Sequence, residues 1–206
     1  VSGSLDFGTS GQLKRECATE IAATLAFSAI QNNDKIGVIF FSDYIEKYIA
    51  PKKGRKHILY LIREMLTFTP NSKRTDVGVS LEYLNKVMKR RCTAFVISDF
   101  YTRKDFSQEL RIANKKHDVV AIQIYDPRAK EMPDVGLMKV VDAETGHEMY
   151  IDTHDARLRK VHNKYWEERE IRLHEMLSQS HVDSVAIATD DDYVKMLMTL
   201  FSKRNR

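Results

Sequence analysis

The chain has 206 residues, of which 43% are hydrophobic and 30% are charged, and this balance is typical of one globular domain rather than a disordered or fibrous chain. Its 33 basic and 29 acidic residues leave a net charge of +4, which is too balanced to indicate a nucleic-acid-binding protein. The longest apolar-rich stretch, residues 21–30, is much shorter than the roughly 20 residues that cross a bilayer, so we expect no membrane span in this chain.

Segments typical of buried strands alternate with segments typical of helices. In chain order the pattern predicts a helix at 11–32, strands at 35–41 and 45–50, helices at 54–68 and 76–90, a strand at 93–97, a helix at 105–117 and a strand at 118–125. The strand at 45–50 is an edge strand that ends before Pro51. Continuous apolarity in the other strands predicts burial on both faces. The alternation therefore predicts an α/β, three-layer, Rossmann-like domain with a mostly parallel central sheet.

Two segments depart from this alternation, and we expect them to be additions to a single domain that covers residues 1–206. Residues 136–142 and 147–153 flank a Gly-containing turn, which predicts a β-hairpin insertion over about 136–153. Residues 153–181 predict a long charged helix that docks through a narrow stripe of Leu158, Val161 and Tyr165. A buried strand at 184–188 and a helix at 191–202 close the fold.

The two cysteines indicate a reducing compartment. Cys17 and Cys92 lie far apart in the sequence and belong to no Cys-x-x-Cys or Cys/His cluster. Isolated cysteines of this kind are typical of reduced thiols in an intracellular protein. We therefore expect a cytoplasmic protein.

Oxygen-bearing side chains stand in three loops that precede or follow predicted elements. Ser2 and Ser4 share a glycine-containing loop, Thr75 precedes a helix, and Asp99 follows the strand at 93–97. Loops at the carboxyl ends of parallel strands meet at one edge of the sheet, and hydroxyl and carboxylate oxygens are ligands that Mg²⁺ or Mn²⁺ accepts. Each group also has a purely structural interpretation, as part of a terminus, a helix cap or a turn.

In this order the residues resemble the metal-ion-dependent adhesion site of the von Willebrand factor A domain. That motif is Asp-x-Ser-x-Ser, followed by Thr and Asp in later loops. The resemblance implies that Ser2, Ser4 and Thr75 bind the cation directly or through water, that Asp99 acts in the outer shell, and that an acidic side chain of a partner takes an open position. The leading Asp of the motif would precede Val1, so we expect Mg²⁺ or Mn²⁺ in the full-length protein and an empty or weak site in this chain.

The whole chain is also similar to the bacterial family catalogued as domain of unknown function 58. The similarity rests on landmarks that include Lys14-Arg15-Glu16, Phe41-Ser42-Asp43, Arg74-Thr75-Asp76, Ile97-Ser98-Asp99-Phe100 and Asp126-Pro127-Arg128. Such proteins are commonly associated with MoxR-type AAA+ ATPases in the assembly or maturation of other proteins. The resemblance implies a non-catalytic interaction domain with a protein partner, for which a MoxR-type AAA+ ATPase is the candidate.

An enzyme is the alternative from a different class. Carboxylates at strand ends would suit a metal-dependent nuclease or phosphoesterase, and these carboxylates belong to Asp6, Asp76, Asp99 and Asp126. The basic run at 51–57 lacks interleaved aromatic residues and is typical of a solvated loop, and no nucleophile elbow, P-loop or His-Glu-x-x-His motif occurs. We therefore expect neither catalysis nor a nucleic-acid partner. An interaction domain that binds no metal is a third alternative.

The first strand of the A-domain fold does not appear in the chain. In that fold it would lie between the strands at 35–41 and 93–97, so both would have unpaired edges that face a slot. Because each unsatisfied buried backbone group costs roughly 1–3 kcal/mol, we expect a further strand or closure of the two strands to fill the slot.

Overall fold

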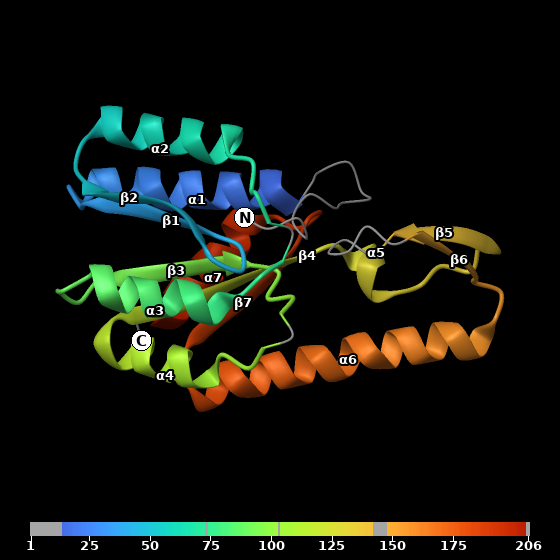
Figure 1. Ribbon diagram of the computed structural model, residues 1–206. Helices are drawn as coiled ribbons and strands as arrows, with labels where there is room; N and C mark the ends of the chain where they lie inside the picture. The colour runs from blue at the N-terminus through green and yellow to red at the C-terminus, as the bar shows by residue number, and fades with distance from the viewer. Residues whose placement is uncertain (1–13, 73, 103, 142–147, 205–206) are drawn as a thin grey trace.

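A computed structural model describes residues 14–72, 74–102, 104–141 and 148–204. The elements in chain order are α1 (Lys14–Gln31), β1 (Ile36–Phe41), β2 (Ile45–Lys52), α2 (Arg55–Thr67), α3 (Val77–Val87), β3 (Thr93–Ser98), α4 (Ser107–Lys116), β4 (Asp118–Tyr125), α5 (Pro127–Lys130), β5 (Leu137–Val141), β6 (Glu148–Asp152), α6 (Ala156–Gln179), β7 (Asp183–Ala188) and α7 (Tyr193–Arg204). Figure 1 shows that helices cover both sides of the strands, with the β5–β6 hairpin at one end.

The predicted parallel strands are confirmed in a sheet with the order β3-β4-β7. The central strand β4 is buried along nearly its whole length, as its continuous apolarity predicts. β1 and β2 form a separate antiparallel pair, so the parallel sheet has three strands among the described residues. In the described part of the chain, β1 and β3 are not hydrogen-bonded to each other, and the two sheets meet at the place where the sequence predicts a slot.

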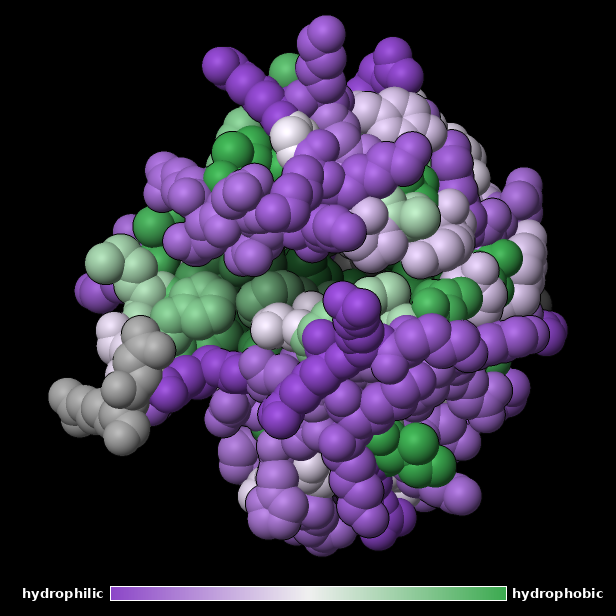
Figure 2. All heavy atoms as spheres, turned by 90° about the vertical axis from the view of Figure 1, so that its left-hand side faces the viewer, coloured by the Kyte–Doolittle hydropathy of each residue, from purple (hydrophilic) through white to green (hydrophobic). Residues whose placement is uncertain are grey.

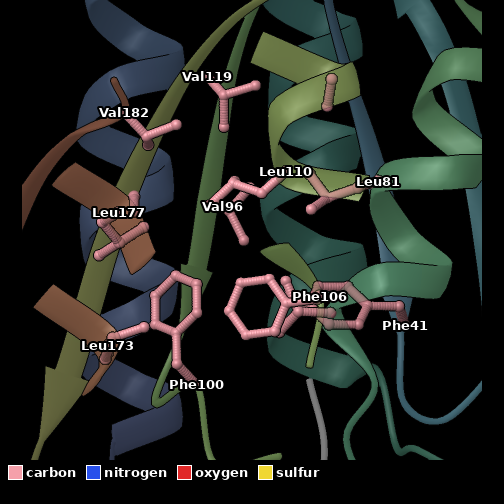
Figure 3. Packing of buried hydrophobic residues seen from close by; sticks show 13 residues of the cluster. Phe41, Leu81, Val96, Phe100, Phe106, Leu110, Val119, Leu173, Leu177 and Val182 are labelled. Carbon is pink, nitrogen blue, oxygen red and sulfur yellow. The ribbon is translucent and has the colours of Figure 1, made fainter. Parts of the chain in front are cut away.

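Two hydrophobic clusters cover the two faces of the parallel sheet. On one face, Val96 and Val119 pack against residues of α3, α4 and α6, and Figure 3 shows this cluster with Phe100 and Phe106 at its lower end. On the other face, Ile122 and Ile124 pack against α1 and α7. Alternate residues of β4 thus point to opposite faces, so the domain has the helix–sheet–helix layering that the sequence predicts.

The antiparallel pair β1–β2 contains an irregularity at Gly37. The register shifts between Ile36 and Val38, and a Cβ atom added to Gly37 would lie only 2.6 Å from the carbonyl oxygen of Ile49. Pro51 lies beside the same position, inside β2, so the prediction that the strand ends before this proline is wrong. A bulge tolerates a residue without an N–H group, which explains why the strand continues.

The two sheets leave a boundary between them. Among the described strands, β1 pairs only with β2, and β3 pairs only with β4. Figure 2 shows the end of the molecule that faces left in Figure 1, where hydrophobic side chains lie in a hollow between the two sheets. Val38 of β1 and Phe95 of β3 are half-buried hydrophobic residues on these strands. Among the described strands, the edges predicted at 35–41 and 93–97 are thus unpaired and have not closed onto each other, while the expected further strand between them stays a prediction.

The hairpin and the long helix form an extension from the sheet, as predicted (Figure 1). β5 and β6 pair in antiparallel register, and α6 has 24 residues. The predicted docking stripe is wrong, however, because Val161 and Tyr165 are 70% and 47% exposed, whereas the buried residues of α6 are Leu173 and Leu177. The first half of α6 extends beyond the sheet, so only its second half contacts the core (Figure 1).

None of the helices in the described residues combines the length and the apolarity needed to cross a membrane. Cys17 and Cys92 are both free cysteines, as expected.

Candidate functional site

The carboxyl end of β3 turns sharply and holds a buried carboxylate. Asp99 is only 6% exposed, and its Oδ1 accepts a hydrogen bond of 3.1 Å from the backbone N–H of Tyr101. The next residue, Phe100, has a φ of 51°, a left-handed conformation that is unusual for a bulky side chain. Its ring stacks on that of Phe106 with the centroids 6.1 Å apart. This packing offsets the local backbone strain, and strain of this kind is common at functional sites.

Lys14 neutralises the charge of Asp99. Its Nζ lies 3.1 Å from Oδ2 of Asp99, and the two side chains are 10% and 8% exposed. Lys14 is the first residue of α1, so the ion pair joins the start of that helix to the end of β3. A charged carboxylate that is buried needs such a partner, because the uncompensated charge would be costly to remove from water.

Arg169 of α6 braces the same loop. Its Nη2 donates a hydrogen bond of 3.2 Å to the backbone carbonyl of Asp99. Its guanidinium lies over the rings of Tyr101 and Trp166, at 4.5 and 4.9 Å from their centroids. Burial lowers the pKa of Arg169 from its ordinary value, while the nearby Asp99 charge opposes that shift. The loop after β3 is therefore held by α1 on one side and α6 on the other.

The Thr75–Asp76 segment lies at the same end of the sheet. Thr75 and Asp76 are both buried, and the N–H of Asp76 donates a hydrogen bond of 2.8 Å to the carbonyl of Ser42, which follows β1. Nζ of Lys104, in the loop after β3, lies 2.6 Å from Oδ2 of Asp76. Ser42, Asp76 and Lys104 thus link three segments that are far apart in the sequence.

Asp76, rather than Thr75, caps α3. Its Oδ1 accepts a hydrogen bond of 3.3 Å from the N–H of Val79, and its backbone is extended, as an N-cap residue requires. The helix-cap interpretation of Thr75 is therefore wrong by one residue. Thr75 instead lies one position before the cap, where it is buried and makes interactions of its own.

Ser42 and Glu46 form further polar contacts next to Asp76, and neither was predicted from the sequence as a site residue. Oγ of Ser42, which is fully buried, donates a hydrogen bond of 2.9 Å to Oε1 of Glu46, and the same carboxylate accepts from Asn71 and Ser72. Burial alone would raise the pKa of Glu46, but these hydrogen bonds outweigh burial and lower it. The Phe41-Ser42-Asp43 landmark is the signal that points to this position.

The donors near Asp99 have the chemistry of a hard-cation site. Thr75 supplies a hydroxyl and Asp99 a carboxylate, both at the carboxyl end of the parallel sheet. Ser2 and Ser4 lie outside the described residues. Within the described ranges, no group of three or more His, Cys, Asp or Glu side chains is arranged to hold a metal ion. Because Lys14 already pairs with Asp99, this carboxylate fits an outer-shell position better than direct coordination.

The carboxylates of the enzyme alternative have separate structural roles. Asp126 is fully buried, and its Oδ1 accepts a hydrogen bond of 2.9 Å from the N–H of Arg128 at the start of α5. Asp76 caps α3, and Asp99 pairs with Lys14. Asp6 lies outside the described residues. Each described carboxylate is thus already engaged by a lysine or by backbone N–H groups.

Comparison with known proteins identifies the family. Residues 1–171 match the family described as "Protein of unknown function DUF58", and the chain belongs to this family, as its landmarks predict. It is 33% identical over 148 residues to an uncharacterized protein of Mycobacterium tuberculosis, a match that covers 71% of this chain and 47% of that protein. An uncharacterized protein of Mycobacterium avium is 28% identical over 160 residues, which cover 77% of this chain and 94% of that protein. The chain thus spans about half the length of the M. tuberculosis relative.

Two solved structures share the fold. The conserved hypothetical protein BatB from Bacteroides thetaiotaomicron superposes with a TM-score of 0.66 at 14% identity, over 98% of this chain and 94% of that chain. An aerotolerance-related membrane protein from Bacteroides fragilis gives a TM-score of 0.67 at 13% identity, over 99% and 94% of the two chains. At such low identity, the likeness shows a common fold.

Proposed function

We propose that the carboxyl end of β3 is a protein-interaction site of the von Willebrand factor A type, which uses Mg²⁺ or Mn²⁺ to bind an acidic side chain of a partner. The observation that carries this proposal is the junction of the Thr75–Asp76 segment with the loop after Asp99, made by Lys104 and Asp76 at 2.6 Å. It brings a buried hydroxyl and a buried carboxylate to one edge of the sheet.

The residues have distinct roles in this proposal. Ser2, Ser4 and Thr75 supply neutral oxygens to the ion, directly or through water, and Asp99 orients the outer shell. An ion held by so few carboxylates stays electrophilic, so it favours an external Asp or Glu as its remaining ligand. Lys14 satisfies Asp99 when no ion is bound and competes with the ion for the charge of this carboxylate.

Catalysis is not part of this proposal. Asp76 caps a helix, Asp99 pairs with Lys14, and Asp126 accepts a backbone hydrogen bond. Hydrolytic metal sites instead gather several carboxylates around one or two ions. We infer that the domain acts in the cytoplasm in the assembly or maturation of other proteins, with a MoxR-type AAA+ ATPase as the candidate partner. This candidate partner is taken from what the resemblance of the sequence to its family implies.

Calorimetric titration of the full-length protein with MgCl₂ and MnCl₂ tests the site. We expect saturable binding that Thr75→Ala and Asp99→Asn each weaken at least tenfold. Thr199→Ala and Asp34→Asn are matched controls, because both positions are exposed and lie far from Thr75 and Asp99 in the sequence. Binding that is unchanged in both site variants would refute the metal site, and metal-dependent nucleic-acid cleavage lost in Asp99→Asn would favour the enzyme.

Affinity capture with the full-length protein, with and without a chelator, tests the partner. A purified MoxR-type ATPase should be retained in Mg²⁺, and it should be released by chelator or by Thr75→Ala. If the ATPase stays bound in the presence of chelator and also binds the Thr75→Ala variant, an interaction domain that uses no metal is favoured.

A further inference from the structure

A groove separates the second half of α6 from residues 100–102 and 104–107, which follow β3. It encloses about 660 Å³ and opens to solvent. Phe106 and Leu173 form an apolar floor, since both are nearly buried members of the core cluster in Figure 3, and half-buried Met176 packs against the same cluster. The groove lies beside Asp99 but uses different side chains.

Cationic side chains line this floor. Among the described lining residues, the basic ones are Lys104, Arg111, Arg169 and Arg172, and the acidic ones are Asp105 and Glu175. Lys104 is paired with Asp76, whereas Asp105 accepts a hydrogen bond of 2.9 Å from the N–H of Ser107 and keeps a negative charge that acts on Arg111.

Of the described lining cations other than Lys104, Arg111 and Arg172 are exposed. The sequence places Glu168 one turn before Arg172, but Glu168 lies 3.7 Å from Lys164 instead. Among the described residues, Arg172 forms no ion pair, and Arg111 makes one hydrogen bond, from Nε to the carbonyl of Ser107. The described lining thus has four basic and two acidic residues, so an excess of positive charge lies above an apolar floor.

The wall of the groove nearest Asp99 is rigid. Arg169 stacks on Tyr101 and Trp166, and the ring of Tyr165 meets that of Trp166 edge-on with the centroids 6.3 Å apart. The side chains of this wall are fixed by these contacts and by the hydrogen bond from Arg169 to Asp99. Because these side chains of the protein are already fixed, they would lose little conformational entropy when a ligand binds.

We propose that this groove binds an acidic, extended peptide segment of a protein partner. Apolar side chains of the segment would lie on Phe106, Leu173 and Met176, and its carboxylates would pair with Arg111 and Arg172. The lining residues of α6 extend from Tyr165 to Gln179, about 21 Å of helix, which matches roughly six residues of extended chain. A polynucleotide fits less well, because two exposed arginines cannot follow a phosphate backbone and the floor is apolar.

The test is selection of a phage-displayed library of random eight-residue peptides on the full-length protein in the presence of chelator. We expect enrichment of peptides in which Asp or Glu alternates with Leu, Ile or Phe. Anisotropy titration of the enriched peptide should show at least a tenfold loss of affinity in the Arg111→Glu, Arg172→Glu double variant. The matched control is Arg157→Glu, Lys160→Glu, which reverses two exposed charges on the same helix, away from the groove.

Several results would overturn the proposal. These are enriched peptides without acidic residues, equal losses in the groove and control variants, or displacement of the peptide by a 20-nucleotide single-stranded RNA at similar concentration. Thermal melting of each variant by circular dichroism separates misfolding from loss of contact. Because the assay contains chelator, peptide binding can succeed while the metal site fails, and Thr75→Ala should leave peptide binding unchanged.

Discussion

The buried ion pair between Lys14 and Asp99 makes a quantitative prediction. Lys14→Met removes the charge and keeps a side chain of similar length, so Asp99 is left 8% exposed; among the described residues, the N–H of Tyr101 and the nearby charge of Arg169 remain to stabilise its carboxylate. Removing one partner of a buried pair typically costs 3–5 kcal/mol, and the remaining hydrogen bond places the expected loss near the lower end, about 3 kcal/mol. For a chain of this length, such a loss lowers the melting temperature by roughly 6–12 °C.

Urea denaturation of wild type, Lys14→Met, Asp99→Asn and the double variant measures this pair directly. The double variant should be more stable than the sum of the two single losses implies, because it has no uncompensated charge. Under the proposed function, Mg²⁺ should also stabilise Lys14→Met more than wild type, since the competing ammonium is gone. A loss below about 1 kcal/mol, or strict additivity in the cycle, would refute our reasoning that the pair is excluded from water.

Three other features of the described chain give measurable expectations in urea or thermal denaturation. Leu110→Ala, at a core position that is 1% exposed, should cost about 2–5 kcal/mol, whereas Leu59→Ala, at a position that is 50% exposed, should stay within about 0.5 kcal/mol; equal losses would contradict the core assignment. Gly37→Ala should cost about 1–3 kcal/mol, because the new Cβ would lie 2.6 Å from the carbonyl oxygen of Ile49, and unchanged stability would mean that β2 moves away freely. Burial raises the pKa of Cys17 from 9.0 to about 11, so above pH 9 the unfolded chain ionises while the folded protein keeps a thiol, and the unfolding free energy should fall between pH 9 and 11 by at most about 3 kcal/mol. Cys17→Ala should lack this part of the pH dependence, and identical slopes for the two proteins would disprove it.

The parallel strands were predictable because burial on both faces leaves a strong local pattern. The segment 118–125 is apolar almost throughout, and β4 occupies those residues. The docking face of α6 was not predictable in the same way. Periodicity shows that Leu158, Val161 and Tyr165 share one side of the helix, but it does not show that the sheet ends before it reaches them.

The candidate site was predictable only where local sequence determines it. Asp99 directly follows a buried strand, so its place at the sheet edge follows from the strand itself. The cap of α3 was misplaced by one residue because Thr75 and Asp76 are both good N-cap residues. Lys14 could not be assigned to Asp99, since the two are 85 residues apart and the contact depends on how α1 packs on the sheet.

The long helix α6 contacts the base of the β5–β6 hairpin near one end and the loop after β3 farther along. Near its first turn, Nη1 of Arg159 hydrogen-bonds to the carbonyl of Thr153 and lies 3.1 Å from Oδ2 of Asp134, so this end is fixed to the base of the hairpin. Ten residues later, or about 15 Å along the axis, Arg169 holds the carbonyl of Asp99. A continuous helix transmits tilt as a rigid rod. Displacement of the hairpin by any bound molecule would therefore move the guanidinium of Arg169 against Asp99, and the projecting end of the protein would act as a lever on the site.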